Sequence, residues 1–90
     1  MKKKIKTYSP FELDTDKDEP TFVGNSHRWW LIEISRTKRF CIYVTEKIDT
    51  KKKMYVLLDN KTEQVVRDTE SLDDILIHME VFDRALQIGG

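Results

Sequence analysis

Residues 39–48, RFCIYVTEKI, alternate between two faces and are rich in β-branched and aromatic side chains. Phe40, Ile42 and Val44 fall on one side, and Cys41 and Tyr43 fall on the other. This alternation is typical of a β-strand, and it is clearer here than anywhere else in the chain. The segments on either side of this strand decide which fold it joins.

Three further segments predict strands. Residues 29–35 alternate in the same way, and residues 54–59 and 63–68 follow the first strand along the chain. The connections at residues 35–38 and 49–53 are short and polar, which implies antiparallel neighbours. Asp59 and Asn60 begin a turn, because both residue types bond to their own backbone. The sequence therefore predicts an antiparallel meander of three to four strands.

The last segment predicts an amphipathic helix. The Ser71 hydroxyl can accept a hydrogen bond from an amide of the first turn, and Asp73 and Asp74 suit the positive end of the helix dipole. Gly89 and Gly90 end the helical pattern. Apolar residues recur at steps of three and four and form one stripe: Leu72, Ile75, Leu76, Met79, Phe82 and Leu86.

These elements predict an α+β fold in which the C-terminal helix covers one face of the meander. The chain has 90 residues, enough for one domain. We divide it into an irregular acidic and aromatic N-terminal arm at residues 1–27 and a sheet-and-helix domain at residues 28–90. Pro10, Pro20 and the acidic residues 14–19 argue against a buried element in the arm, and we expect only a short edge strand near residues 4–8.

The two faces of the sheet lead to different expectations. The face expected under the helix carries Trp30, Ile32, Ile34, Phe40, Ile42, Val44, Met54, Val56 and Leu58. The second face carries Trp29, Leu31, Cys41, Tyr43, Tyr55 and Leu57. So large an apolar surface requires a cover. We expect the arm to fold across it through Phe11, Leu13 and Phe22, and an interface with a partner or a second copy is the alternative.

The net charge of zero conceals a separation of sign. Residues 28–53 hold eight basic and three acidic residues, whereas residues 54–90 hold three basic and eight acidic residues. Separated charge favours charged partners. In a meander the loop near Arg36 and the lysines at 51–53 lie at opposite ends, and the helix begins near those lysines. Positive charge is then left uncompensated at Arg36, Lys38 and Arg39.

A DNA-binding function is the alternative that this basic loop suggests. Residues 29–87 resemble, in topology, the small amino-terminal DNA-binding domains of some integrases. That resemblance implies a sheet laid in the major groove, with the basic β-hairpin loop in contact with DNA. Phosphate neutralisation supplies most non-specific affinity, and the overall neutrality of the chain weakens this alternative.

The sequence contains no familiar catalytic or metal-binding motif. His27, His78 and Cys41 lack the spacing of a zinc site, and the acidic run at residues 14–18 continues with Glu19 where a calcium loop needs glycine. No phosphate loop, nucleophile elbow or dinucleotide fingerprint occurs. We therefore expect no enzymatic activity, no cofactor, no metal and no small-molecule substrate.

The remaining expectation is a small interaction protein. We expect it to bind and inhibit or modulate a larger protein complex, as a bacterial or phage-type accessory protein of a nucleic-acid-processing or defence system. A homodimer and nucleic acid are the other partners considered, and no membrane is expected. The single cysteine fits a cytoplasmic location. The predicted partner-binding residues are Trp29, Tyr43, Tyr55, Arg36, Lys38 and Arg39.

Overall fold

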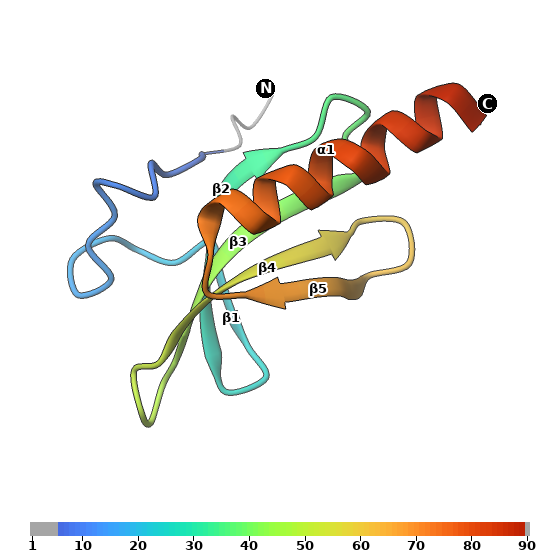
Figure 1. Ribbon diagram of the computed structural model, residues 1–90. Coiled ribbons are helices and arrows are strands. Elements are labelled where there is room, and N and C mark those ends of the chain that lie inside the picture. The colour runs from blue at the N-terminus through green and yellow to red at the C-terminus, as the bar shows by residue number, and fades with distance from the viewer. Residues whose placement is uncertain (1–5, 90) are drawn as a thin grey trace, which may run out of the picture.

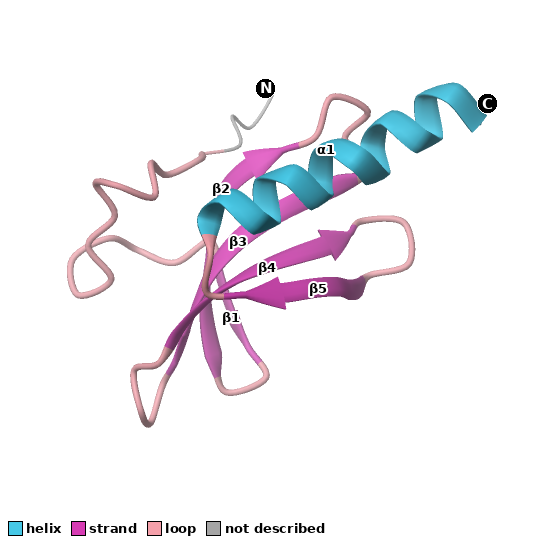
Figure 2. Ribbon diagram, in the orientation of Figure 1, coloured by secondary structure: helices cyan, strands magenta, loops and turns pink. Residues whose placement is uncertain are grey.

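A five-stranded antiparallel sheet carries one helix across one of its faces (Figure 1). The computed structural model describes residues 6–89. Strands pair in chain order, so each strand neighbours the next one, and Figure 2 shows the helix lying across the sheet. The elements are β1 (Phe22–Gly24), β2 (His27–Ile34), β3 (Phe40–Lys47), β4 (Lys53–Asp59), β5 (Gln64–Thr69) and α1 (Leu72–Gly89). The predicted α+β meander with a C-terminal helix is confirmed, with one strand more than expected.

The additional strand is β1, which lies within the segment expected to be an irregular arm. It has three residues and pairs with the start of β2, Phe22 lying opposite Trp29. Asn25 and Ser26 form the connecting turn with φ of 54° and 63°, the geometry that favours a tight hairpin. A strand this short shows no alternation, which is why the pattern does not reveal it. The edge strand expected near residues 4–8 falls partly outside the described residues, and Lys6 to Tyr8 are not strand.

The assignment of β4 side chains to the two faces was wrong. Directly paired residues share a face. Val44 pairs with Tyr55 and Ile42 with Leu57, so Tyr55 and Leu57 lie on the helix side. The residues expected on the helix side, Met54, Val56 and Leu58, therefore alternate onto the second face, where Val56 and Leu58 join its core.

Ile34 also moves to the second face, because β2 is irregular between Leu31 and Glu33. The extra residue shifts the alternation, and Ile34 pairs with Cys41. The sheet thus separates two cores. The helix-side core contains Ile32, Phe40, Ile42, Val44, Leu57 and Ile75. The second-face core contains Trp29, Leu31, Cys41, Tyr43 and Val56.

The helix begins as predicted, and two of its carboxylates tie it to the sheet. The Ser71 hydroxyl accepts a hydrogen bond from the Asp74 amide at 3.2 Å. Arg67 of β5 donates two hydrogen bonds to the Asp74 carboxylate, at 2.8 and 2.9 Å. Further along, the buried Asp83 carboxylate accepts hydrogen bonds from the hydroxyl and amide of Thr37 in the β2–β3 turn. Both ends of α1 are therefore anchored by side-chain contacts as well as by apolar packing.

The N-terminal arm divides between the two faces of the sheet. Its first part, which includes Leu13, lies on the helix side, and the expected cover of the second face is confirmed only for Phe22. Tyr8 and Leu13 pack against the helix-side core beside α1. The Tyr8 amide donates to the Leu31 carbonyl at 2.8 Å, so the arm also follows the outer edge of β2. The fully buried Trp30 donates its indole N–H to the Asp18 carbonyl at 3.0 Å. The arm is thus held by backbone groups as well as by apolar contacts.

Candidate protein-binding surface

The predicted site residues Trp29 and Tyr43 lie together on the second face, where both are buried. The Phe22 ring stacks on Trp29 with ring centroids 5.1 Å apart and meets the edge of Tyr43 at 5.5 Å. The Trp29 indole donates to the Gly24 carbonyl at 3.1 Å. Burial raises the pKa of the Tyr43 hydroxyl. The Phe22 side chain of β1 therefore covers these two aromatic rings, which is the part of the expected cover that the structure confirms.

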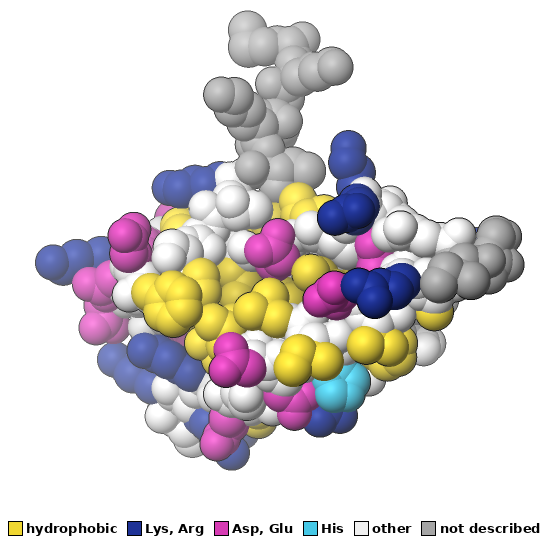
Figure 3. Space-filling model, turned by 45° about the horizontal axis from the view of Figure 1, so that its top comes forward, with side chains coloured by type: hydrophobic (Ala, Val, Ile, Leu, Met, Phe, Trp, Pro, Cys, Tyr) yellow, Lys and Arg dark blue, Asp and Glu magenta, His cyan; other side chains and the backbone are white. Residues whose placement is uncertain are grey.

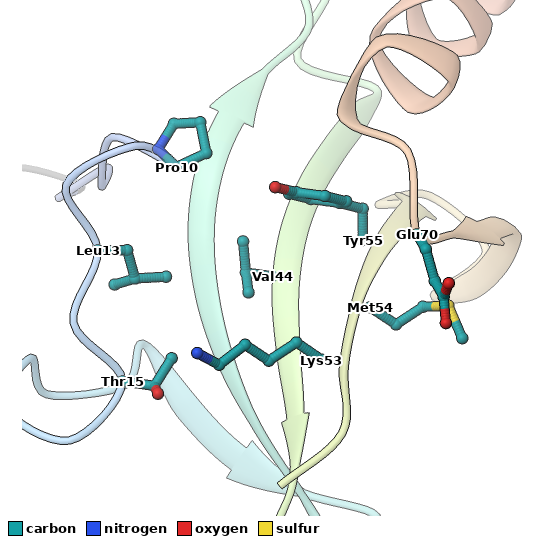
Figure 4. Close-up of a pocket in the computed structure, with 8 residues that line it drawn as sticks. All are labelled: Pro10, Leu13, Thr15, Val44, Lys53, Met54, Tyr55 and Glu70. Carbon is teal, nitrogen blue, oxygen red and sulfur yellow. The ribbon is translucent and has the colours of Figure 1, made fainter.

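Tyr55 is separated from those two residues by the sheet. It packs against the helix-side core and lines a pocket between the arm and the start of α1. The volume of this pocket is about 250 Å³. Figure 4 shows Leu13 and the Tyr55 ring reaching toward the pocket from opposite sides, while the Lys53 side chain extends toward Thr15. The complete lining is Pro10, Leu13, Thr15, Val44, Lys53, Met54, Tyr55 and Glu70.

Phe11 belongs to the turn that supplies part of this pocket's lining, and its side chain is almost entirely exposed, at 87% of its surface. A hydrogen-bonded turn holds it, because the Ser9 carbonyl accepts from the amides of Glu12 and Leu13 at 3.1 and 3.0 Å. Pro10 and Leu13, on either side in the same turn, line the pocket. The expectation that Phe11 anchors the arm to the sheet was wrong. Ser9 followed by Pro10 is a signal for a turn at this place in the chain, but it does not tell which side chain of the turn is exposed.

A buried polar cluster fixes the arm beside this turn. The Thr15 hydroxyl donates to Glu46 Oε2 at 2.7 Å, and both residues are buried. Arg28 places its guanidinium 3.6 Å from the other carboxylate oxygen of Glu46. A buried carboxylate that loses one of its partners is costly, so these contacts hold the arm in one position. We call the exposed Phe11 ring, together with the Tyr55 pocket, the arm surface.

Arg36, Lys38 and Arg39 lie together at the β2–β3 turn but differ in their surroundings. Arg39 donates to both carboxylate oxygens of Asp59, at 2.7 and 2.9 Å. The hydrogen bond from Arg39, followed by those from two backbone amides, outweighs burial and lowers the pKa of Asp59. Arg36 and Lys38 are exposed and form no ion pair among the described residues. Only two of the three predicted basic residues thus remain available to a partner.

Arg36 lines a second pocket, between β2 and the outer half of α1. Its volume is about 330 Å³, and its walls combine the apolar Leu76 and Met79 with charged residues of both signs, including Glu33 and Arg84. Figure 3 shows apolar side chains gathered in the middle of this face, with acidic and basic side chains set around and between them. The lysines at 51–53 belong to the opposite end of the sheet, as expected from the meander.

The buried or half-buried carboxylates are engaged in holding the fold together. Glu46 bonds to the arm, Asp59 to Arg39 and Asp83 to Thr37. Burial alone would raise the pKa of Asp83, but its hydrogen bonds outweigh that effect and lower the pKa. His78 contacts Asp74 Oδ1 at 2.7 Å. Within residues 6–89 no three metal-ligating side chains gather closely enough to hold an ion.

Comparisons of the chain with protein-family models, curated proteins and solved structures find no match. No helix in the described part of the chain has the length and apolar character needed to cross a membrane.

Proposed function

We propose that this protein acts without catalysis, by binding a larger protein through the arm surface and thereby inhibiting or modulating the complex that its partner forms. The observation that carries the proposal is the exposed Phe11 ring on an ordered turn whose neighbouring residues line a pocket of mixed apolar and charged character. The engagement of the buried carboxylates in structural contacts supports a non-catalytic role. A bacterial or phage-type origin and a nucleic-acid-processing or defence target remain predictions from size and composition.

The exposed Phe11 ring leaves free energy of burial available to an interface. Burying a Phe side chain fully contributes about 1.5–3 kcal/mol, and in isolation Phe11 gains none of this. A ring that enters a pocket of a partner becomes a typical hot spot of an interface. Because the turn at Ser9 and the Thr15–Glu46 contact already order the arm, binding loses little additional conformational entropy.

The pocket in the arm surface offers the partner a second contact, because a pocket can receive a side chain just as Phe11 can be inserted into one. It combines apolar walls from Leu13, Val44 and Tyr55 with the charged side chains of Lys53 and Glu70 at its rim. We propose that it receives one apolar side chain of the partner while Phe11 enters the partner. Interfaces commonly combine an apolar centre with a polar rim in this way.

A protein partner is better supported than DNA. Most of the affinity of a DNA-binding protein comes from basic side chains that neutralise phosphates. Here Arg39 is already paired with Asp59, and the lysines at 51–53 lie at the other end of the sheet from Arg36 and Lys38. A DNA-binding regulator using the basic hairpin loop would have only a small part of this positive charge in one place.

Site-specific photocrosslinking tests the proposal. A photoreactive phenylalanine analogue replaces Phe11 in one variant and Val23 in the matched control, which is 60% exposed on β1. After irradiation in cells of the source organism, we expect one discrete adduct with a larger protein from position 11 and none from position 23. The same adduct from both positions, or no adduct from position 11, would contradict the proposal.

A further inference from the structure

The side of α1 that faces away from the sheet carries a second apolar row. Ile77 and Val81 are 59% and 57% exposed, and Ala85 follows one turn later and is also exposed. These three residues line a shallow hollow together with Glu80 and Arg84. Contacts with β3, β4 and β5 engage the other side of the helix, as Figure 1 shows. No described part of the chain covers this row, so it is available to a second molecule.

We propose that this row binds a second copy of the chain, so that two α1 helices pack antiparallel about a two-fold axis near Val81. Rows of residues four apart pack into the grooves of a second helix in the commonest class of helix contact. On this axis each Val81 faces its copy, and Ile77 of one chain faces the small Ala85 of the other. The large and small side chains thus complement each other.

The charged flank of the row is what selects a second copy as the occupant. Glu80 and Arg84 lie on the same flank of the row, and within one helix the Arg84 guanidinium lies 2.8 Å from Glu80 Oε1. A two-fold axis perpendicular to the helices brings each flank against the same flank in reverse order. With the axis at Val81, Glu80 of one chain is offset along the helix by about 3 Å from Arg84 of the other, and this attractive pair occurs twice, whereas the two Glu80 residues share the same offset only once. A parallel arrangement would instead place Glu80 against Glu80.

The small area of this contact between helices implies a weak dimer. One helix face covers less than the roughly 800 Å² per partner of a standard interface, so we expect a weak dimer that depends on concentration. The dimer contact and the Tyr55 pocket share no lining residue. The inference is therefore independent of the proposed function, and a dimer would present two copies of the arm surface.

Sedimentation velocity of single charge variants and of their mixture tests the arrangement. Glu80→Arg places like charges together across the axis, and so does Arg84→Glu. We expect each variant to dimerise at least about tenfold more weakly than wild type. An equimolar mixture of the two should recover most of the wild-type dimer, because every pair across the axis is then opposite in sign. The pair within each helix stays broken in that mixture, so recovery reports on the contact between chains.

Two substitutions of Val81, each with a matched control at Val23, locate the contact. Val81→Glu should abolish the dimer, whereas Val23→Glu, at the similarly exposed Val23 on β1, should leave it unchanged. Val81→Cys should oxidise to a disulfide-linked dimer. This measurement tests the contact at Val81 even if a charge variant fails to fold. A wild-type chain that stays monomeric at all concentrations would overturn the proposal. A mixture that dimerises no better than the single variants, or Val81→Cys oxidising no faster than Val23→Cys, would overturn it too.

Discussion

Two isoleucines on opposite sides of α1 give a quantitative test of the fold. Ile75 is fully buried against the helix-side core, whereas Ile77, two residues later, is 59% exposed. Ile75→Ala removes the carbons beyond Cβ, at about 0.8 kcal/mol each, so lost transfer free energy accounts for about 2.4 kcal/mol. The cavity that remains raises the loss of unfolding free energy to about 3–4 kcal/mol.

Ile77→Ala is the matched control, because both substitutions gain the same intrinsic helix propensity. We expect its unfolding free energy to stay within about 0.5 kcal/mol of wild type. The difference in unfolding free energy between the two variants therefore measures the effect of burying the isoleucine side chain. A chain of this length has a total stability of about 5–13 kcal/mol, so the Ile75→Ala protein should still fold.

Guanidinium unfolding followed by tryptophan fluorescence provides the assay, at protein concentrations where the chain is monomeric. With a slope of about 2 kcal/mol/M, the Ile75→Ala midpoint should fall by about 1.5–2 M and the Ile77→Ala midpoint should hardly move. Equal midpoints for the two variants would refute the packing of α1 on the sheet through Ile75.

Three further predictions follow from the polar contacts and the buried thiol. The pKa of Asp59 is lowered by Arg39, so this contact stabilises the fold above about pH 4 and is lost as the pH falls toward the folded-state pKa. Asp59→Asn should therefore lower stability at neutral pH and flatten its acid dependence, as measured by thermal unfolding between pH 2 and pH 7 (roughly the range set by carboxyl titration). Thr15→Val should lower the free energy of unfolding by about 1–3 kcal/mol, because it removes a hydrogen bond to the buried Glu46. It should also make the arm more susceptible to limited proteolysis. Burial raises the pKa of Cys41, so its thiol should react with a thiol reagent only after denaturant is added; a fast reaction with the native protein would contradict its buried position.

Strands β2 to β5 and the helix could be predicted because their information is local. Alternation in β3 and the spacing of apolar residues in α1 depend on neighbours only a few positions away, and the Ser71 cap is likewise local. The faces of β4 could not be predicted in the same way. They depend on the exact path of the preceding loop, where Lys51 adopts a φ of 59°. One residue more or less in that loop exchanges the two faces.

The arm surface was beyond sequence analysis for a different reason. The arm is placed by hydrogen bonds to backbone carbonyls, such as those of Leu31 and Asp18, and backbone groups leave no pattern of side-chain types. Apolar composition assigned Phe11, Leu13 and Phe22 alike to the second face, but only Phe22 lies there, because Leu13 packs on the helix side and Phe11 is exposed. Only the turn at Ser9 shows that Leu13 points inward while Phe11 remains exposed. Of the predicted binding residues, Tyr55 alone lines the pocket beside Phe11.

The central claim is that Phe11 is the anchor through which the protein binds its partner. Its most direct test is the affinity of the crosslinked partner, measured by titration calorimetry for wild type, Phe11→Ala and the control Val23→Ala. We expect Phe11→Ala to weaken binding by at least about tenfold, corresponding to about 1.4 kcal/mol, and Val23→Ala to bind as wild type does. Equal affinities for wild type and Phe11→Ala would contradict the account.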